Sequence, residues 1–323
     1  MRNYMIKRFV LIIPTLFIIT LVLFIAYRSV PGNVVDLLVQ QHGTELEGTP
    51  GTLEAREEMI ELLGLDEPPH IAYFKWVWGI ISGGDFGESL WTGVPMMEEF
   101  KRRIPVSFEL SIMGMFIGAL LQPMMGLYCA LRQDSVGDYA IRVWSVLTMA
   151  IPGFWIATII LTYPAIWWNW TPPIEYIPFT RDPLGNLAQF ALPSVIMGIF
   201  GGGGGVRMIR AYFLEVMRQD YIRTAYSKGL SELVVVFRHG FRNVMIPFIS
   251  SIGAFLPSLI SSSVIVEQIF SLPGMGRYLL QAATQRDYNV ICGATLVFSL
   301  YTLVVIVVTD LAYAVVDPRI RYR

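Results

Sequence analysis

The chain has 323 residues, of which 54% are hydrophobic and only 15% are charged, and its mean hydropathy is +0.54. Because a soluble domain is nearer a quarter charged, this composition excludes an ordinary soluble protein and indicates an integral membrane protein. The net charge of −1 gives no sign of a nucleic-acid partner, and no nucleic-acid-binding motif is visible.

Six apolar stretches exceed the roughly 17 residues that a helix needs to cross a bilayer. We therefore expect an all-α membrane protein with six transmembrane helices. We do not interpret the first stretch as a cleaved signal peptide, because no cleavage site follows it and five more stretches do. The six predicted spans cover residues 9–27, 106–128, 143–168, 187–206, 244–266 and 290–316.

The loops between these spans differ strongly in charge. If the N-terminus is cytoplasmic, the inner segments 1–8, 129–142, 207–243 and 317–323 hold 15 of the 24 Lys and Arg but only six of the 25 acids. Lys and Arg concentrate on the cytoplasmic side of membrane proteins. The sequence therefore predicts that both termini are cytoplasmic.

The sizeable outer region is 28–105. Thr52 can cap a helix over 53–63, Pro95 suits the first turn of a helix over 95–103, and 83–87 has the glycines of a turn. This region could be a lid, a surface for an outer partner or a packed connector.

Five consecutive glycines at 201–205 invite a phosphate-loop interpretation. That motif needs Lys followed by Ser or Thr after its last glycine, whereas Val206 and Arg207 follow here. We expect the glycines to allow a bend or a close helix contact instead.

Polar residues inside the spans are candidates for a translocation pathway. Gln122 lies in the second span, and Ser258 and Ser262 lie in a serine-rich fifth span that suits either tight helix packing or the wall of a polar passage. Glu109 and Asp310 also fall within spans, where a paired structural role is favoured over a functional one. No cluster of His, Cys or carboxylates has metal-site or catalytic spacing, so we expect neither a metal site nor catalytic residues.

The segment 214–230 lies between two apolar runs and is too polar to span a membrane. Leu214, Met217, Tyr221 and Ala225 would form a narrow apolar stripe on one helix, and Gly229 could end it. On the cytoplasmic side, such a helix is a candidate docking element for a partner protein.

Several short motifs in fixed order run along nearly the whole chain. With them, the chain resembles the permease subunits of ABC importers for dipeptides, oligopeptides and nickel, and more narrowly the first of their two permease subunits. The motifs are Arg8-Phe9 to Pro31-Gly32, Leu63-Gly64-Leu65-Asp66-Glu67-Pro68, Gly84-Asp85-Phe86-Gly87-Glu88-Ser89, Arg103-Ile104-Pro105, Ala150-Ile151-Pro152-Gly153-Phe154, Asp220 to Ala225 with Lys228-Gly229-Leu230, Arg238-His239 with Arg242-Asn243, Glu267-x-x-Phe270 with Pro273-Gly274-Met275-Gly276, and Asp317-Pro318-Arg319-Ile320.

This resemblance implies a six-helix permease of the type I importer kind. Residues 1–27 would form the cytoplasmic N-terminus and first helix, 28–105 the outer region, and 106–323 the permease core with a coupling helix at about 211–230. The residues that would couple to the ATPases are Asp220, Tyr221, Arg223, Thr224, Ala225, Lys228 and Gly229. Arg223 stands where the general importer motif has a glutamate.

The resemblance also implies partners and a location. These are a second, homologous permease, two cytoplasmic ATP-binding subunits, an extracytoplasmic substrate-binding protein and the lipid of a bacterial or archaeal cytoplasmic membrane. The chain would hold no cofactor and would not be an enzyme, since ATP and Mg²⁺ would bind the ATPase subunits.

Alternative functions stay open at this point. Peptide is the expected substrate class, with oligosaccharide and nickel as runners-up. A secondary transporter is the main alternative from another class, although the internal repeats and midplane acids typical of one are not convincing here. A membrane enzyme is less favoured because no catalytic cluster is visible.

Overall fold

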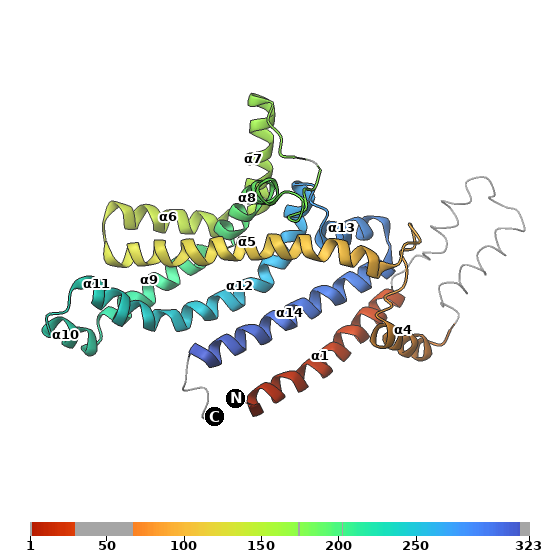
Figure 1. The fold of residues 1–323 in the computed structure, drawn as a ribbon, viewed down its shortest axis with the longest axis horizontal. Coiled ribbons are helices and arrows are strands. Elements are labelled where there is room, and N and C mark those ends of the chain that lie inside the picture. Colours follow the sequence, from red (N-terminus) through yellow and green to blue (C-terminus); the bar gives the residue numbers. More distant parts are fainter. Residues whose placement is uncertain (1, 30–66, 174, 202, 317–323) are drawn as a thin grey trace, which may run out of the picture. The chain divides into compact units, whose positions relative to one another are not determined.

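The computed structural model describes residues 2–29, 67–173, 175–201 and 203–316, and the regular secondary structure of this part of the chain is helical apart from one isolated bridge between Glu88 and Pro95 (Figure 1). The predicted helix over 53–63 lies outside these residues. The helices are α1 (Arg2–Ser29), α4 (Pro69–Gly83), α5 (Met96–Leu131), α6 (Val136–Ala150), α7 (Gly153–Trp168), α8 (Pro183–Phe200), α9 (Gly203–Met217), α10 (Asp220–Ser227), α11 (Glu232–Val234), the π-helix η1 (Val235–Phe241), α12 (Arg242–Ile269), α13 (Met275–Gln285) and α14 (Tyr288–Val316).

Four predicted spans each lie within one helix, namely 9–27, 106–128, 244–266 and 290–316, whereas 143–168 and 187–206 are each divided between two helices. In the described residues, Met96–Leu131, Pro183–Phe200 and Tyr288–Thr309 are long and apolar enough to cross a membrane, and a bent pair of helices can count as a fourth. Val10–Ala26 forms a shorter apolar helix. The fifth expected span lies within α12, several of whose side chains lie outside the described residues.

The third predicted span is broken. Its apolar run is divided into α6 and α7, which meet at an angle of 96°. Ile151 and Pro152 between them are extended, with ψ of 124° and 130°. Since Pro152 has no N–H to continue the hydrogen-bonding of α6, a helix ends before it and a new one begins after it. The expectation of one continuous helix over 143–168 is therefore wrong.

The glycine run also separates two helices, since α8 ends at Phe200 and α9 begins at Gly203. Three of its glycines make close approaches. A Cβ on Gly201 would clash with Phe255, one on Gly203 would lie 2.8 Å from the Ser145 carbonyl oxygen, and one on Gly205 would clash with Gln122. The run therefore gives both a break and close contacts with α12, α6 and α5.

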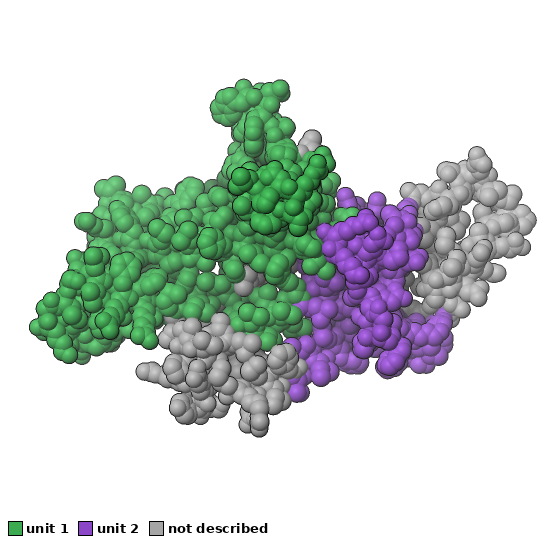
Figure 2. Space-filling view, in the orientation of Figure 1, with its two compact units in different colours: residues 1–6, 103–277, 301–323 green, residues 7–102, 278–300 purple. Residues whose placement is uncertain are grey.

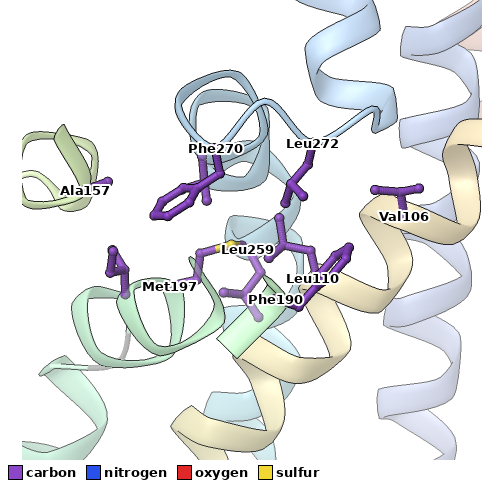
Figure 3. Packing of buried hydrophobic residues seen from close by; sticks show 10 residues of the cluster. Val106, Leu110, Ala157, Phe190, Met197, Leu259, Phe270 and Leu272 are labelled. Atoms are coloured by element: carbon purple, nitrogen blue, oxygen red, sulfur yellow. The ribbon is translucent and has the colours of Figure 1, made fainter. Parts of the chain in front are cut away.

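Two compact units make up the chain, one of residues 1–6, 103–277 and 301–323 and one of 7–102 and 278–300 (Figure 2). The core of the first unit surrounds Met197, where side chains of α5, α8 and α12 meet (Figure 3). A second apolar cluster in this unit centres on Ile209 and Phe213 of α9. These clusters hold together the helices that carry the candidate site.

The second unit is held by a buried carboxylate, that of Asp287. It accepts hydrogen bonds from Ser89 Oγ (2.6 Å) and Leu90 N (3.1 Å), and its other oxygen accepts from Val290 N (3.2 Å) in the first turn of α14. Asp287 thus caps α14 while fixing the loop before α5. Gly84 and Gly87 in this loop have φ of 65° and 88°, the left-handed conformation that favours glycine.

The Glu267 and Pro-Gly-Met-Gly motifs form one buried cluster in the first unit. Ser107 Oγ donates to Glu267 Oε1 (2.7 Å) and accepts from Met275 N (2.8 Å), while Arg277 N donates to Glu267 Oε2 (3.0 Å). A Cβ on Gly276 would lie 2.5 Å from Val264 Cα, so glycine is needed there. The cluster closes the turn into α13, which is the short helix expected after this motif.

Candidate functional site

The segment expected to dock a partner consists of two helices. α9 ends at Met217 and α10 begins at Asp220, with Gln219 extended between them (φ −73°, ψ 149°). The prediction of one helix over 214–230, or about 211–230, is therefore wrong. Asp220 in the first turn of α10 favours a helix start there, because an acidic side chain interacts well with the positive end of the helix dipole.

α10 packs on η1 through a small apolar core. Ile222 and Ala225 of α10 and Val235 of η1 are buried, with Met217 packed against them. Ala225 is only 4% exposed, so it faces inward. A bulky side chain at Ala225 would therefore disturb the packing of α10 on η1.

Gly229 ends the helical segment, as the sequence predicts. Its φ is +73°, in the left-handed region that favours glycine, and its N–H donates to Tyr226 O (2.9 Å). A Cβ there would meet no atom within 4 Å. The position is constrained by its backbone conformation and is open on its surface.

The outward face of α10 is charged. Arg223 and Asp220 lie 4.0 Å apart as an exposed ion pair, and Thr224 and Lys228 are exposed beside them. An exposed pair of this kind contributes little to stability. These side chains are therefore free to bind a partner.

An exposed apolar group adjoins these charges, and we call it the distal apolar surface: Tyr226, Leu230, Leu233 and Phe237. Leu233 is 71% exposed and Phe237 54%. Sequence analysis missed Leu233 and Phe237, although both are apolar residues in the polar inner loop. α10 and α11 lie at the end of the first unit where α9 ends and α12 begins (Figure 1).

Tyr221 connects α10 to α12. Its hydroxyl accepts a hydrogen bond from Asn243 Nδ2 (2.8 Å), and the same amide donates to His239 O (2.8 Å). Together with the Ile222–Val235 packing, this bond gives α10 two attachments to the chain that leads into α12. A displacement of α10 can therefore be passed to that long helix.

The three candidate pathway residues fall in different environments. Gln122 is buried and packs against Gly118 and Gly205, inside the first unit, so it does not line an open path there. Ser262 is exposed, and its hydroxyl donates to Leu259 O (3.0 Å). The side chain of Ser258 lies outside the described residues.

One of the two acids inside the predicted spans has a partner. Glu109 is half-buried and accepts from Asn186 Nδ2 (3.4 Å), which also donates to Ile177 O (2.9 Å). This pairing fits the structural role. The side chain of Asp310 lies outside the described residues.

Residues 122–322 match the family described as binding-protein-dependent transport system inner membrane components. The chain belongs to this family. It is a multi-pass inner membrane permease, a transport subunit of an ABC system, and its predicted family and all-α fold are confirmed.

Curated relatives of this inner membrane component match it along its whole length. It is 33% identical to the oligopeptide transport system permease protein AppB of Bacillus subtilis (strain 168), with 100% of both chains covered. It is 31% identical to the dipeptide transport system permease protein DppB of Escherichia coli (strain K12), again over 100% of each chain.

A solved structure shares the fold. The chain matches the MetNI methionine ABC transporter, in inward-facing conformations, with a TM-score of 0.53 and 13% identity over 69% of this chain and 98% of that one. At this identity, the likeness concerns the fold alone.

Proposed function

We propose that this inner membrane component is the first of two permease subunits of an ATP-driven peptide importer. A similar second permease would complete the pathway, an extracytoplasmic binding protein would deliver the peptide, and two cytoplasmic ATPases would supply the energy. The oligopeptide and dipeptide permeases named among its full-length relatives support peptide as the substrate class.

The observation that carries this proposal is the outward face of α10 with the distal apolar surface. Arg223 and Lys228 can make charge-assisted hydrogen bonds to a partner's acids, and Leu233 and Phe237 can fill an apolar groove. The charge bias of the loops supports a cytoplasmic location for this end and for both termini. ATP and Mg²⁺ would bind the ATPase subunits, since the chain has no nucleotide-binding motif.

Coupling would use the two attachments of α10. An ATPase that moves α10 would move η1 through Ile222 and Val235, and would move the start of α12 through the Tyr221–Asn243 hydrogen bond. α12 carries Ser262 and Ser258, which remain proposed pathway residues. Gln122 is not proposed as a pathway residue, because it packs between helices of this chain.

The test is transport in proteoliposomes that contain the whole complex. We expect uptake of a labelled oligopeptide to require the binding protein, the ATPases and ATP. A maltooligosaccharide and Ni²⁺, each supplied to the same complex, should not stimulate ATP hydrolysis.

Other outcomes would identify another function. Uptake that follows a proton or sodium gradient without ATP would contradict the proposal and indicate a secondary transporter. ATP-dependent uptake of oligosaccharide or nickel, but not peptide, would retain the permease role and overturn the substrate.

A further inference from the structure

A pocket of about 510 Å³ lies between α6 and α9 in the first unit. Its polar side holds three arginines, Arg142 of α6 and Arg207 and Arg210 of α9. Pockets that bind small ligands have volumes of about 300–1,000 Å³, so this one is large enough for a polar headgroup and the start of a chain.

The pocket has more arginines than the nearby acids can neutralise. Asp138 is fully buried and is bound by Arg210 through two hydrogen bonds of 2.9 and 2.8 Å, which raise the pKa of Arg210. Asp138 also accepts from Asp134 N (3.0 Å). Asp138 pairs with both Arg210 and Arg142, and the nearby Asp134 also acts on Arg210, so two carboxylates face three guanidinium groups.

Arg142 and Arg207 have N–H groups that are not fully used in hydrogen bonds or ion pairs. Arg142 Nε lies 3.4 Å from Asp138 Oδ1, but its Nη2 is buried and has no hydrogen-bond partner in the described part of the chain. Its guanidinium carbon lies 4.3 Å from the centroid of the Tyr139 ring, which holds the group at the pocket. Arg207 is exposed and meets no carboxylate within 4.0 Å among the described residues.

The other side of the pocket is apolar. Val143, Val146 and Leu147 follow the i, i+3, i+4 spacing that puts residues on one face of a helix, and they are 58%, 51% and 44% exposed. α6 begins in the inner segment predicted between the second and third spans. The arginines thus lie at the inner end of an apolar helix face.

We propose that this pocket binds one anionic phospholipid. Its phosphate accepts hydrogen bonds from Arg142 and Arg207, and an acyl chain lies along the α6 face over Val146 and Leu147. Excess guanidinium beside an apolar face fits a lipid better than a soluble anion, which would leave that face uncovered. Placing the lipid in the cytoplasmic leaflet rests on the proposed orientation, whereas the binding itself does not.

The test is native mass spectrometry of the full chain in its complex, released from detergent and titrated with dioleoyl phosphatidylglycerol. We expect the complex to retain one molecule of dioleoyl phosphatidylglycerol in preference to dioleoyl phosphatidylcholine. Arg207→Gln should weaken that binding roughly tenfold, the scale of one charge-assisted hydrogen bond. Arg132→Gln is the matched control, because Arg132 is exposed in the turn before α6 and does not line the pocket.

A second arm separates a lipid from other occupants. A phosphatidylglycerol with a photoreactive acyl chain should crosslink to residues 143–147, and Val146→Asp should abolish this crosslink. The proposal would be overturned if the Arg207→Gln variant retained phosphatidylglycerol as well as the wild type does. Displacement by inorganic phosphate alone would also overturn it, as would a crosslink from this face to the second permease, which would make it a protein interface.

Discussion

Ala225 and Gly229, four residues apart, have different structural roles. Ala225 is small because it packs against Val235, whereas Gly229 is glycine because its φ is +73°. The side chain of Ala225 is buried, so its substitution acts first on the packing of α10.

We expect Ala225→Trp to destabilise the packing of α10 on η1, because overpacking a filled site costs about 1–3 kcal/mol. Thr224→Trp is the matched control, since Thr224 is the neighbouring residue and is exposed. Thermal unfolding of the solubilised protein measures both. Equal melting temperatures for the two variants would show that the site of Ala225 can accommodate a larger side chain.

Helix ends are where sequence and structure differ most. Hydropathy located the apolar runs because it depends only on residue composition. It does not detect that Ile151 and Pro152, within one of these runs, have an extended backbone. In the candidate site, the stripe Leu214, Met217, Tyr221 and Ala225 assumed one continuous helix. The extended Gln219 resets the helix phase, so that Ile222 and Ala225 form the buried face instead.

The break between α8 and α9 predicts that substitution of its glycines changes stability. We expect Gly203→Ala to destabilise the protein by about 1–3 kcal/mol, because its Cβ would lie 2.8 Å from the Ser145 carbonyl oxygen, which is backbone and cannot move aside. It would also strain the 2.5 Å hydrogen bond from Ser145 Oγ to Gly203 O.

The adjacent glycine provides the control with the opposite sign. A Cβ on Gly204 meets nothing within 4 Å, and alanine in a helix is up to about 1 kcal/mol more favourable than glycine. Gly204→Ala should therefore leave stability unchanged or raise it slightly. Melting temperatures that move in the same direction for both variants would contradict this account of the glycine run.

At the scale of the whole molecule, the docking role of the candidate site stays a prediction, whereas the sequence correctly predicted the family and the all-α fold. These depend on local motifs and composition. It missed the role of Asp287, whose hydrogen-bond partners come from a distant segment, and it missed the exposure of Leu233 and Phe237, which depends on how η1 packs. Ser89 and Asp287, for example, are 198 residues apart and form a 2.6 Å hydrogen bond.

The distal apolar surface gives the prediction that tests how the molecule works in its complex. Leu233 is 71% exposed, so Leu233→Asp should leave the melting temperature near that of wild type. If the surface docks on an ATPase, a buried, unpaired carboxylate there should weaken docking by at least about 2 kcal/mol and lower substrate-stimulated ATPase activity roughly tenfold or more. Leu233→Met keeps an apolar side chain and should retain activity. Wild-type ATPase activity and uptake with Leu233→Asp would show that Leu233 lies outside the interface.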